Sequence, residues 1–179
     1  MKKIVLVAFL AITLLQAGWN PFEDSGSKST KTSSEISKTI DSFKKKDSNL
    51  KLFFSKAYGY AVFPEVGKAG IGIGGAYGSG KVFKRGKAVA NVKLTQLTIG
   101  FQLGGQVYSE VVFFKDKSAL NKFLAGDFEL GAQVSAVALT TGASADADYS
   151  NGVAVFTMAK GGLMYEASVG GQKFSIEKF

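Results

Sequence analysis

Glycine and alternating apolar residues after residue 58 are the features that most constrain how this chain folds. Of its 22 glycines, 20 lie from Gly59 onward. Single polar or small residues separate Leu97, Ile99, Phe101 and Leu103, which is the period of a strand with one buried face. Further strand patterns lie at residues 107–114, 133–139, 153–158 and 163–176, the last a hairpin with Gly170 and Gly171 at its turn. Glycines in short strands mark bends, so we predict a mainly β (α+β) fold, either a curved antiparallel sheet or a small closed barrel.

Helical spacing is confined to three segments. Thr32 and Glu35 fit a capping box, and an apolar stripe follows at Ile36, Ile40 and Phe43. A second stripe, capped by Asp47 or Ser48 and stopped by Gly59, consists of Leu50, Phe53, Phe54 and Ala57. A short helical pattern over residues 116–125 ends before Gly126. We therefore expect two amino-terminal amphipathic helices and one short inserted helix.

The amino terminus has the pattern of an export signal. Lys2 and Lys3 precede an apolar run over residues 4–15, and small residues follow at Ala17 and Gly18. We expect a signal peptide over 1–18, a disordered Ser- and Thr-rich linker over 19–35, and a single domain over 36–179. The protein is then periplasmic or peripheral to the cell envelope. A lipid anchor on cysteine is excluded because the sequence contains no cysteine.

The absence of cysteine and histidine restricts the chemistry that the chain can perform. Without them the sequence lacks Ser-His-Asp and Cys-His catalytic groups and every metal site of the His or Cys type. We therefore expect no enzymatic activity, no cofactor and no metal. A hydrolase built on Asp146 and Asp148 is a weak alternative that lacks any partner motif.

The charge balance favours an anionic partner. The formal net charge is +8, and without Lys2 and Lys3 the chain keeps 20 basic residues against 14 acidic ones. Such an excess attracts anionic surfaces. Because export removes the protein from nucleic acid, lipid headgroups are the expected partner.

Three glycine- or aspartate-containing motifs resemble ligand sites but do not meet their requirements. Residues 75–81 have P-loop spacing, yet Val82 stands where Ser or Thr must hold magnesium. Residues 70–75 match a dinucleotide fingerprint, but the alternating Ile71 and Ile73 indicate a strand. Residues 146–157 resemble the start of a calcium loop but end in Thr157 in place of the bidentate Glu.

Two basic segments remain as candidate lipid-binding sites. The first surrounds the second helix and consists of Lys44, Lys45, Lys46, Lys51, Phe53, Phe54 and Lys56. The second surrounds a hairpin tip and consists of Lys81, Lys84, Arg85 and Lys87. The alternative for the first is that its aromatic rings pack on the sheet while its lysines are merely solvated. For the second, the alternative is a solubilising turn.

From about Leu50 onward the chain resembles the SYLF domain family, in its bacterial exported branch. The resemblance is carried by residues 57–64 (AYGYAVFP), 68–80 (KAGIGIGGAYGSG), 100–106 (GFQLGGQ), 145–148 (ADAD) and 161–165 (GGLMY). It implies a non-enzymatic lipid-binding module. Eukaryotic members bind phosphoinositide membranes through basic residues and an amino-terminal amphipathic helix, and some yeast members bind actin.

Anionic phospholipid is the part of this description that transfers to an exported protein. The alternative function is an envelope scaffold, an actin-binding-like module that binds a protein partner or associates with itself. A stable oligomer that is indifferent to lipid charge would indicate the scaffold.

Overall fold

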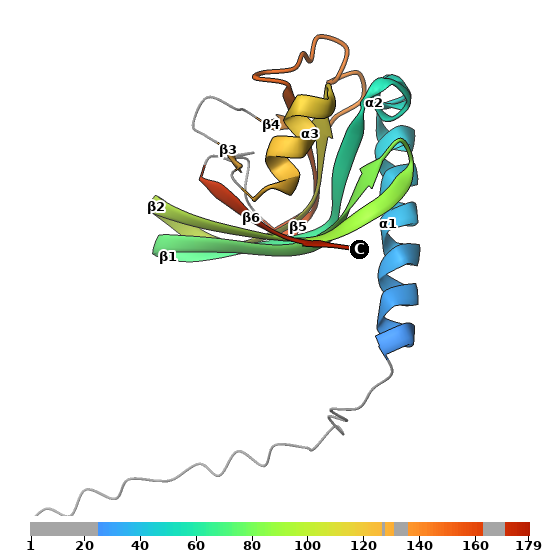
Figure 1. Cartoon of the computed structure of the whole chain (residues 1–179). Helices are drawn as coiled ribbons and strands as arrows, with labels where there is room; N and C mark the ends of the chain where they lie inside the picture. The colour runs from blue at the N-terminus through green and yellow to red at the C-terminus, as the bar shows by residue number, and fades with distance from the viewer. Residues whose placement is uncertain (1–24, 127, 131–135, 163–170) are drawn as a thin grey trace, which may run out of the picture.

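The computed structural model describes residues 25–126, 128–130, 136–162 and 171–179 (Figure 1). The helices are α1 (Ser25–Lys46), α2 (Leu50–Lys56) and α3 (Lys117–Leu124). The strands are β1 (Gly59–Lys84), β2 (Lys87–Phe114), β3 (Glu129–Leu130), β4 (Ala136–Ala138), β5 (Val153–Gly162) and β6 (Gln172–Lys178). No helix in the described part of the chain is long and apolar enough to span a bilayer.

The strands form one curved, mixed sheet in the order β3-β6-β2-β5-β4, and β1 also pairs with β2. All pairs are antiparallel except β4 with β5. The mainly β prediction is confirmed, in the form of a curved sheet that does not close. The expectation of an entirely antiparallel sheet is wrong at β4, because its connection to β5 returns through the long loop over residues 139–152.

β1 and β2 form one long hairpin whose register runs from Gly59 opposite Phe114 to Lys84 opposite Lys87. Its tip is the pair Arg85 and Gly86, both with positive φ (49° and 77°). Two successive positive φ angles match the right-handed twist of the flanking strands. The separate strands expected at residues 97–103 and 107–114 are therefore parts of one long strand, β2.

β1 folds back on itself and brings the sheet into two layers. The first layer contains residues 59–70 of β1, residues 104–114 of β2, and β5. The second layer contains residues 73–84 of β1, residues 87–99 of β2, and β6. A Cβ on Gly80 would overlap the carbonyl oxygen of Val62, and one on Gly78 would lie 3.0 Å from the carbonyl oxygen of Glu65. The backbone N–H of Arg85 also donates to the carbonyl oxygen of Tyr58 at 3.2 Å. Glycine therefore permits the two halves of one strand to approach at backbone distance.

Two apolar clusters hold the layers and helices together. One lies between the layers and beneath α3, with Phe63, Leu94, Phe114, Leu120, Phe123 and Phe174 among its buried side chains. The other joins α1 and α2 to the outer side of the first layer, through Ile36, Phe43, Leu50, Val111, Phe113 and Phe156. Thus the predicted stripes of both amino-terminal helices face the sheet.

The predicted helices agree with the structure except at the starts of α1 and α2. The N-cap of α2 is Asn49, not Asp47 or Ser48 as predicted, and its side chain makes no capping hydrogen bond. Asp116 caps α3 by accepting from the Ala119 N–H at 2.9 Å, and Gly126 follows with a φ of 80°. α1 begins at Ser25, ahead of the expected capping box at Thr32 and within the expected linker. Once the turn anchored by Ile36 and Phe43 exists, each added residue contributes a hydrogen bond, so the helix extends. Residues 1–24 and 163–170, and with them the signal segment and half of the predicted carboxyl-terminal hairpin, lie outside the described residues.

Candidate functional site

Three aromatic rings in successive contact connect the two basic segments predicted from the sequence. Phe54 of α2 meets Tyr60 of β1 edge to face, with ring centroids 5.1 Å apart. Tyr60 stacks on Phe83 at 5.0 Å and an interplanar angle of 18°. Phe83 directly precedes the hairpin tip. The aromatic contacts therefore run from α2 across the start of β1 to the basic hairpin.

Cations lie over these and adjacent rings. The Nζ of Lys44 is 5.0 Å from the centroid of Phe54. Lys84 and Arg85 lie 5.8 Å and 5.3 Å from the centroid of Tyr58. Cation–π contacts at such distances orient the cation above the ring. Because Tyr58 follows α2 and also accepts the backbone hydrogen bond from Arg85, the hairpin tip is fixed against the end of α2.

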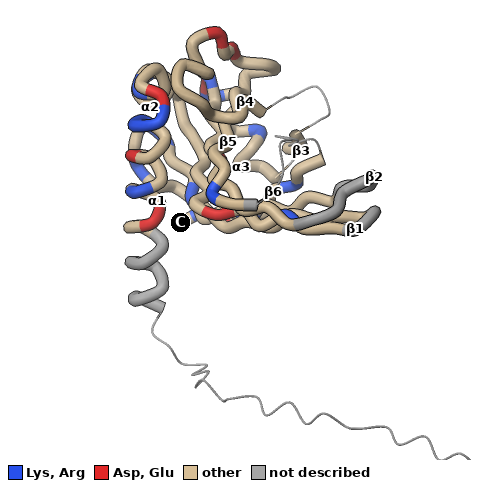
Figure 2. Tube along the Cα trace, turned by 180° about the vertical axis from the view of Figure 1, so that it is seen from behind, with Lys and Arg blue, Asp and Glu red and all other residues tan. Residues whose placement is uncertain are grey.

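We name the resulting surface the basic corner. It consists of Lys44, Lys45, Lys46, Lys51, Lys56, Lys84, Arg85 and Lys87, all exposed except the half-buried Lys44. Within the described ranges, none of these eight cations is in an ion pair. Figure 2 shows Lys and Arg along α1 and α2. Lys44, Lys45 and Lys46 occupy the last turn of α1, where the helix dipole favours positive charge.

Lys81, predicted with the hairpin tip, lies apart from the basic corner. Its Nζ donates to the Oγ of Ser33 in α1 at 3.3 Å and lies 5.6 Å from the ring centroid of Phe179. It therefore connects α1 to the end of β6 on the outer side of the second layer.

Phe53 and Phe54 are half-buried anchors of α2. The ring of Phe53 lies 5.0 Å from that of Phe156 and 5.4 Å from that of Phe113, and Phe54 lies 4.8 Å from Phe113. This packing matches the alternative in which the rings pack on the sheet. The large apolar side chain that α2 does expose is Leu52, at 55%. In the sequence, Leu52 lies off the apolar stripe of this helix, and that position was the signal that its side chain is exposed.

Asp47 holds the connection between α1 and α2 in place. The sequence predicted it only as a possible cap of the second helix. Its Oδ2 accepts hydrogen bonds from the backbone N–H and hydroxyl of Ser144, at 2.8 Å and 2.7 Å, and its Oδ1 accepts from the Asn49 N–H at 3.0 Å. Burial acts to raise the pKa of Asp47, but these hydrogen bonds outweigh it and the pKa is lowered.

A buried polar cluster lies between the two layers of the sheet. The Nε2 of Gln172 in β6 donates to the Oε2 of Glu110 in β2 at 2.9 Å. Glu110 is fully buried, and this burial raises its pKa to about 7, although the Gln172 hydrogen bond opposes the shift. The pKa of Tyr108 is also raised, first by burial and then by the charge of Glu110. The described residues contain no group of three acidic side chains that could hold a metal.

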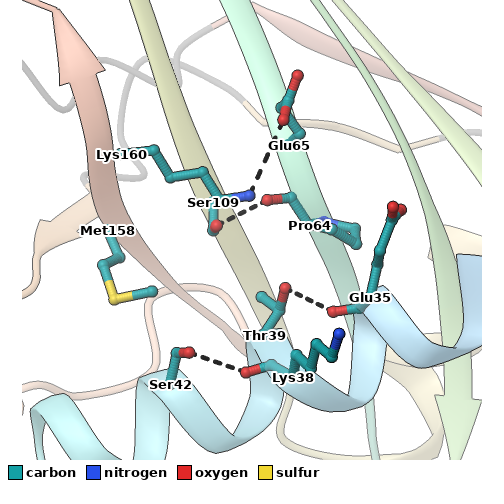
Figure 3. A pocket seen from close by; sticks show the side chains of 9 residues that line it. All are labelled: Glu35, Lys38, Thr39, Ser42, Pro64, Glu65, Ser109, Met158 and Lys160. Carbon is teal, nitrogen blue, oxygen red and sulfur yellow. Dashed lines mark hydrogen bonds and ion pairs between the residues drawn. The ribbon is translucent and has the colours of Figure 1, made fainter.

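A groove of about 260 Å³ lies between α1 and the strands β1, β2 and β5. Figure 3 shows the side chains that line it, which are Glu35, Lys38, Thr39, Ser42, Pro64, Glu65, Ser109, Met158 and Lys160. Lys160 and Glu65 form an ion pair at 3.9 Å across its mouth, and the hydroxyl of Ser109 donates to the Pro64 carbonyl at 2.7 Å. The groove carries both signs of charge and includes none of the predicted lipid-binding residues.

The aspartates of the weak hydrolase alternative lie in the loop that precedes β5. Both Asp146 and Asp148 are exposed, and the Oδ1 of Asp148 accepts from the adjacent Tyr149 N–H. This arrangement is that of a solvated turn. Residues 70–81, which resembled nucleotide-binding loops, lie within β1, so they are strand as predicted.

Comparison with known proteins identifies the family. Residues 95–178 match the family model described as "Ysc84: Las17-binding protein actin regulator". The chain is also 32% identical over 130 residues to "Beta cell expansion factor A" from Aeromonas veronii, a match that covers 72% of this chain and 49% of that protein. The chain therefore spans about half the length of this relative. The exported branch of the expected resemblance stays a prediction, but the family is confirmed: residues 95–178 belong to the Ysc84 (SYLF) family.

Proposed function

We propose that this protein binds anionic phospholipid membranes through the basic corner and performs no covalent chemistry. The Ysc84 (SYLF) family consists of binding modules, and membership supports a lipid- or actin-binding module in general. The observation that carries the lipid proposal is that α1, α2 and the hairpin tip present eight cations, none in an ion pair among the described residues. Three of them, Lys44, Lys84 and Arg85, lie over aromatic rings that link α2 to the hairpin tip. A surface with this composition attracts phosphate headgroups without an internal counter-charge to displace.

The expected affinity is weak and reversible. Each cation near an anionic bilayer contributes about 1 kcal/mol, and the attraction falls off within roughly 8 Å at physiological salt. A flat bilayer contacts only part of a curved corner, so the total is smaller than the sum over eight cations. If the amino-terminal segment acts as the expected export signal, the membrane is that of the cell envelope.

The test is co-sedimentation of the full chain with neutral and anionic vesicles over a salt series. We expect binding to anionic vesicles alone, weakening as salt rises. A variant with Lys51→Gln, Lys56→Gln and Lys84→Gln should bind roughly tenfold more weakly or worse, since each lost cation removes about 1 kcal/mol. The matched control carries Lys115→Gln, Lys117→Gln and Lys122→Gln, which alters the net charge equally but lies at and within α3. If both variants lost vesicle affinity equally, binding would depend on the net charge of the protein and not on the basic corner.

A protein-binding scaffold is the second candidate function. It is favoured by the description of the family model, which names a Las17-binding protein and actin regulator. The two functions differ in their response to lipid charge. Failure of the wild type to bind either vesicle type, together with a stable oligomer in detergent-free size measurement, would replace the lipid proposal with the scaffold.

A further inference from the structure

Four large apolar side chains are exposed on one face of the second sheet layer, three of them near one another in register and Phe179 nearer the hairpin tip. Ile73 is 66% exposed, Tyr77 56%, Leu97 69% and Phe179 69%. Of the large apolar side chains that are prominently exposed in the described ranges, only Leu52 on α2 lies elsewhere. Soluble surfaces scatter such residues singly, so their concentration on one face marks an interaction surface.

The strand register places these residues on the same side of the sheet. Tyr77 lies opposite Thr95, and Thr95 lies opposite Lys173 of β6, while Gly75 lies opposite Leu97. Their neighbours at alternate positions, Ala76, Leu94 and Phe174, point the other way into the core between the layers. Because side chains alternate between the faces of a strand, the exposed set shares the outer face.

Basic side chains border this apolar surface. Lys93, two residues from Thr95 on β2, and Lys173, opposite Thr95 on β6, are both exposed, and Lys81 lies over the ring of Phe179. Glu177, exposed and paired in register with Asn91, is the acidic side chain of β6 on this face. Glu129 of β3, which pairs in register with Lys173, is a second acidic residue on this side of the sheet. Three cations against two anions give the face a positive excess, which is complementary to an anionic surface.

We propose that this outer sheet face is a second membrane contact, which inserts Ile73, Tyr77 and Leu97 into the interface of an anionic bilayer while Lys93 and Lys173 hold its headgroups. This inference rests on the proposed function and adds an apolar component to it. Tyrosine is favoured at the headgroup level because it has an apolar ring and a polar tip. Lysine can extend its apolar stem along the same surface and keep its charge in the headgroup region. A second copy of this chain fits less well, because each copy would present the same positive excess.

The apolar end of the outer sheet face, which holds Ile73, Tyr77 and Leu97, can be tested separately because it lies far from the hairpin tip. Eleven residues of β1 separate Ile73 from Lys84 at the hairpin tip, which is about 36 Å along an extended strand. Figure 1 shows that the bent end of the β1–β2 ribbon projects away from α1 and α2. A substitution in one surface therefore leaves the other intact.

The first experiment places a fluorescent probe in the outer sheet face. The full chain with Trp19→Phe and Tyr77→Trp carries tryptophan only at position 77. With anionic vesicles that contain brominated phospholipid, its emission should shift to the blue and be quenched several-fold. The control carries Trp19→Phe and Asn121→Trp, which places the probe at an exposed position of α3 outside both proposed contacts, and its emission should not change.

The second experiment removes the apolar contact. Ile73→Ser with Leu97→Ser should weaken binding to anionic vesicles roughly tenfold and abolish the fraction that survives high salt, because apolar contacts are not screened. These exposed side chains can change without loss of the core, which circular dichroism would verify. Wild-type binding by this variant, together with an unquenched tryptophan probe at position 77, would overturn the inference and leave the basic corner as the membrane contact. Failure of the wild type to bind anionic vesicles would overturn both proposals. Conversion of a wild-type dimer to a monomer by the double substitution in the absence of lipid would assign the face to a second copy.

Discussion

Gln172 and Glu110 form a hydrogen-bonded pair inside the sheet, with 2.9 Å between the Nε2 of the amide and the Oε2 of the carboxyl group. The pair joins β6 to the carboxyl-terminal part of β2, and both side chains are fully buried. The second oxygens, Oε1 of Glu110 and Oε1 of Gln172, accept no hydrogen bond from the described residues. A neutral carboxyl group is favoured in such surroundings, since an ionised one would lack most of its solvation.

Glu110 should make the fold less stable as pH rises. Its pKa is about 7 in the folded state against 4.5 when solvated, so the folded state holds more protons between these values. The free energy of unfolding therefore falls as pH rises through that window and levels off above it. Glu110→Gln should be more stable than the wild type at pH 8 by up to about 3 kcal/mol and should differ little at pH 4.

Denaturant unfolding at both pH values measures this difference. The control is Glu65→Gln, whose side chain is 70% exposed and should show no comparable pH dependence. The same effect of Glu110→Gln at pH 4 and pH 8 would contradict a protonation origin.

Asp47 should have the opposite pH dependence. Its lowered pKa means that its contribution to stability is present above the ordinary value of 3.8 and is lost as pH falls below it. Asp47→Ala leaves the backbone N–H and hydroxyl of Ser144 without their acceptor. Loss of these bonds should cost about 3 kcal/mol in the free energy of unfolding at pH 7. Asp41→Ala, at an exposed position of α1, is the control, and an equal loss there would contradict the role assigned to Asp47.

Local signals in the sequence predicted the elements whose causes are local. The stripe beginning at Leu50 and the segment between Asp116 and Gly126 carry their own periodicity and end signals, and both are helices in the structure. The positive φ angles of Arg85 and Gly86 agree with the turn expected at the basic hairpin. The composition also sufficed for the fold class.

Features that depend on distant pairs could not be predicted from those signals. The fold of β1 onto itself depends on contact between Val62 and Gly80, which in the sequence look like members of separate strands. The meeting of the two basic segments depends on Arg85 and Tyr58, 27 residues apart. Asp47 and Ser144 are separated by 97 residues, so only the fold reveals their hydrogen bonds. Likewise, the alternation around Tyr77 marks a strand without saying which face is exposed.

The contact between Val62 and Gly80 makes a sharp prediction about glycine. Gly80→Ala places a methyl group on the carbonyl oxygen of Val62, and neither backbone can move without disturbing β1. We expect a loss of roughly 3 kcal/mol in the free energy of unfolding. Gly67→Ala is the matched control, because its Cβ would meet nothing within 4 Å. Thermal unfolding of both variants decides the matter, and a Gly80→Ala protein as stable as Gly67→Ala would show that the halves of β1 are not in contact.

Phe53 and Leu52 are neighbours on α2, but their substitution should affect the free energy of unfolding differently. Phe53 packs on Phe113, Phe156 and Tyr149, so Phe53→Ala leaves a cavity and should lower the free energy of unfolding by about 3 kcal/mol. Leu52 is exposed, so Leu52→Ala should change it by less than about 0.5 kcal/mol. Denaturant unfolding gives the stability of each variant, and vesicle co-sedimentation under native conditions gives its membrane affinity. If Phe53 contacted lipid directly, Phe53→Ala would be as stable as the wild type but would lose vesicle binding. Because the ring instead supports the basic corner from beneath, we expect Phe53→Ala to lose vesicle binding only in proportion to the fraction of protein that is unfolded.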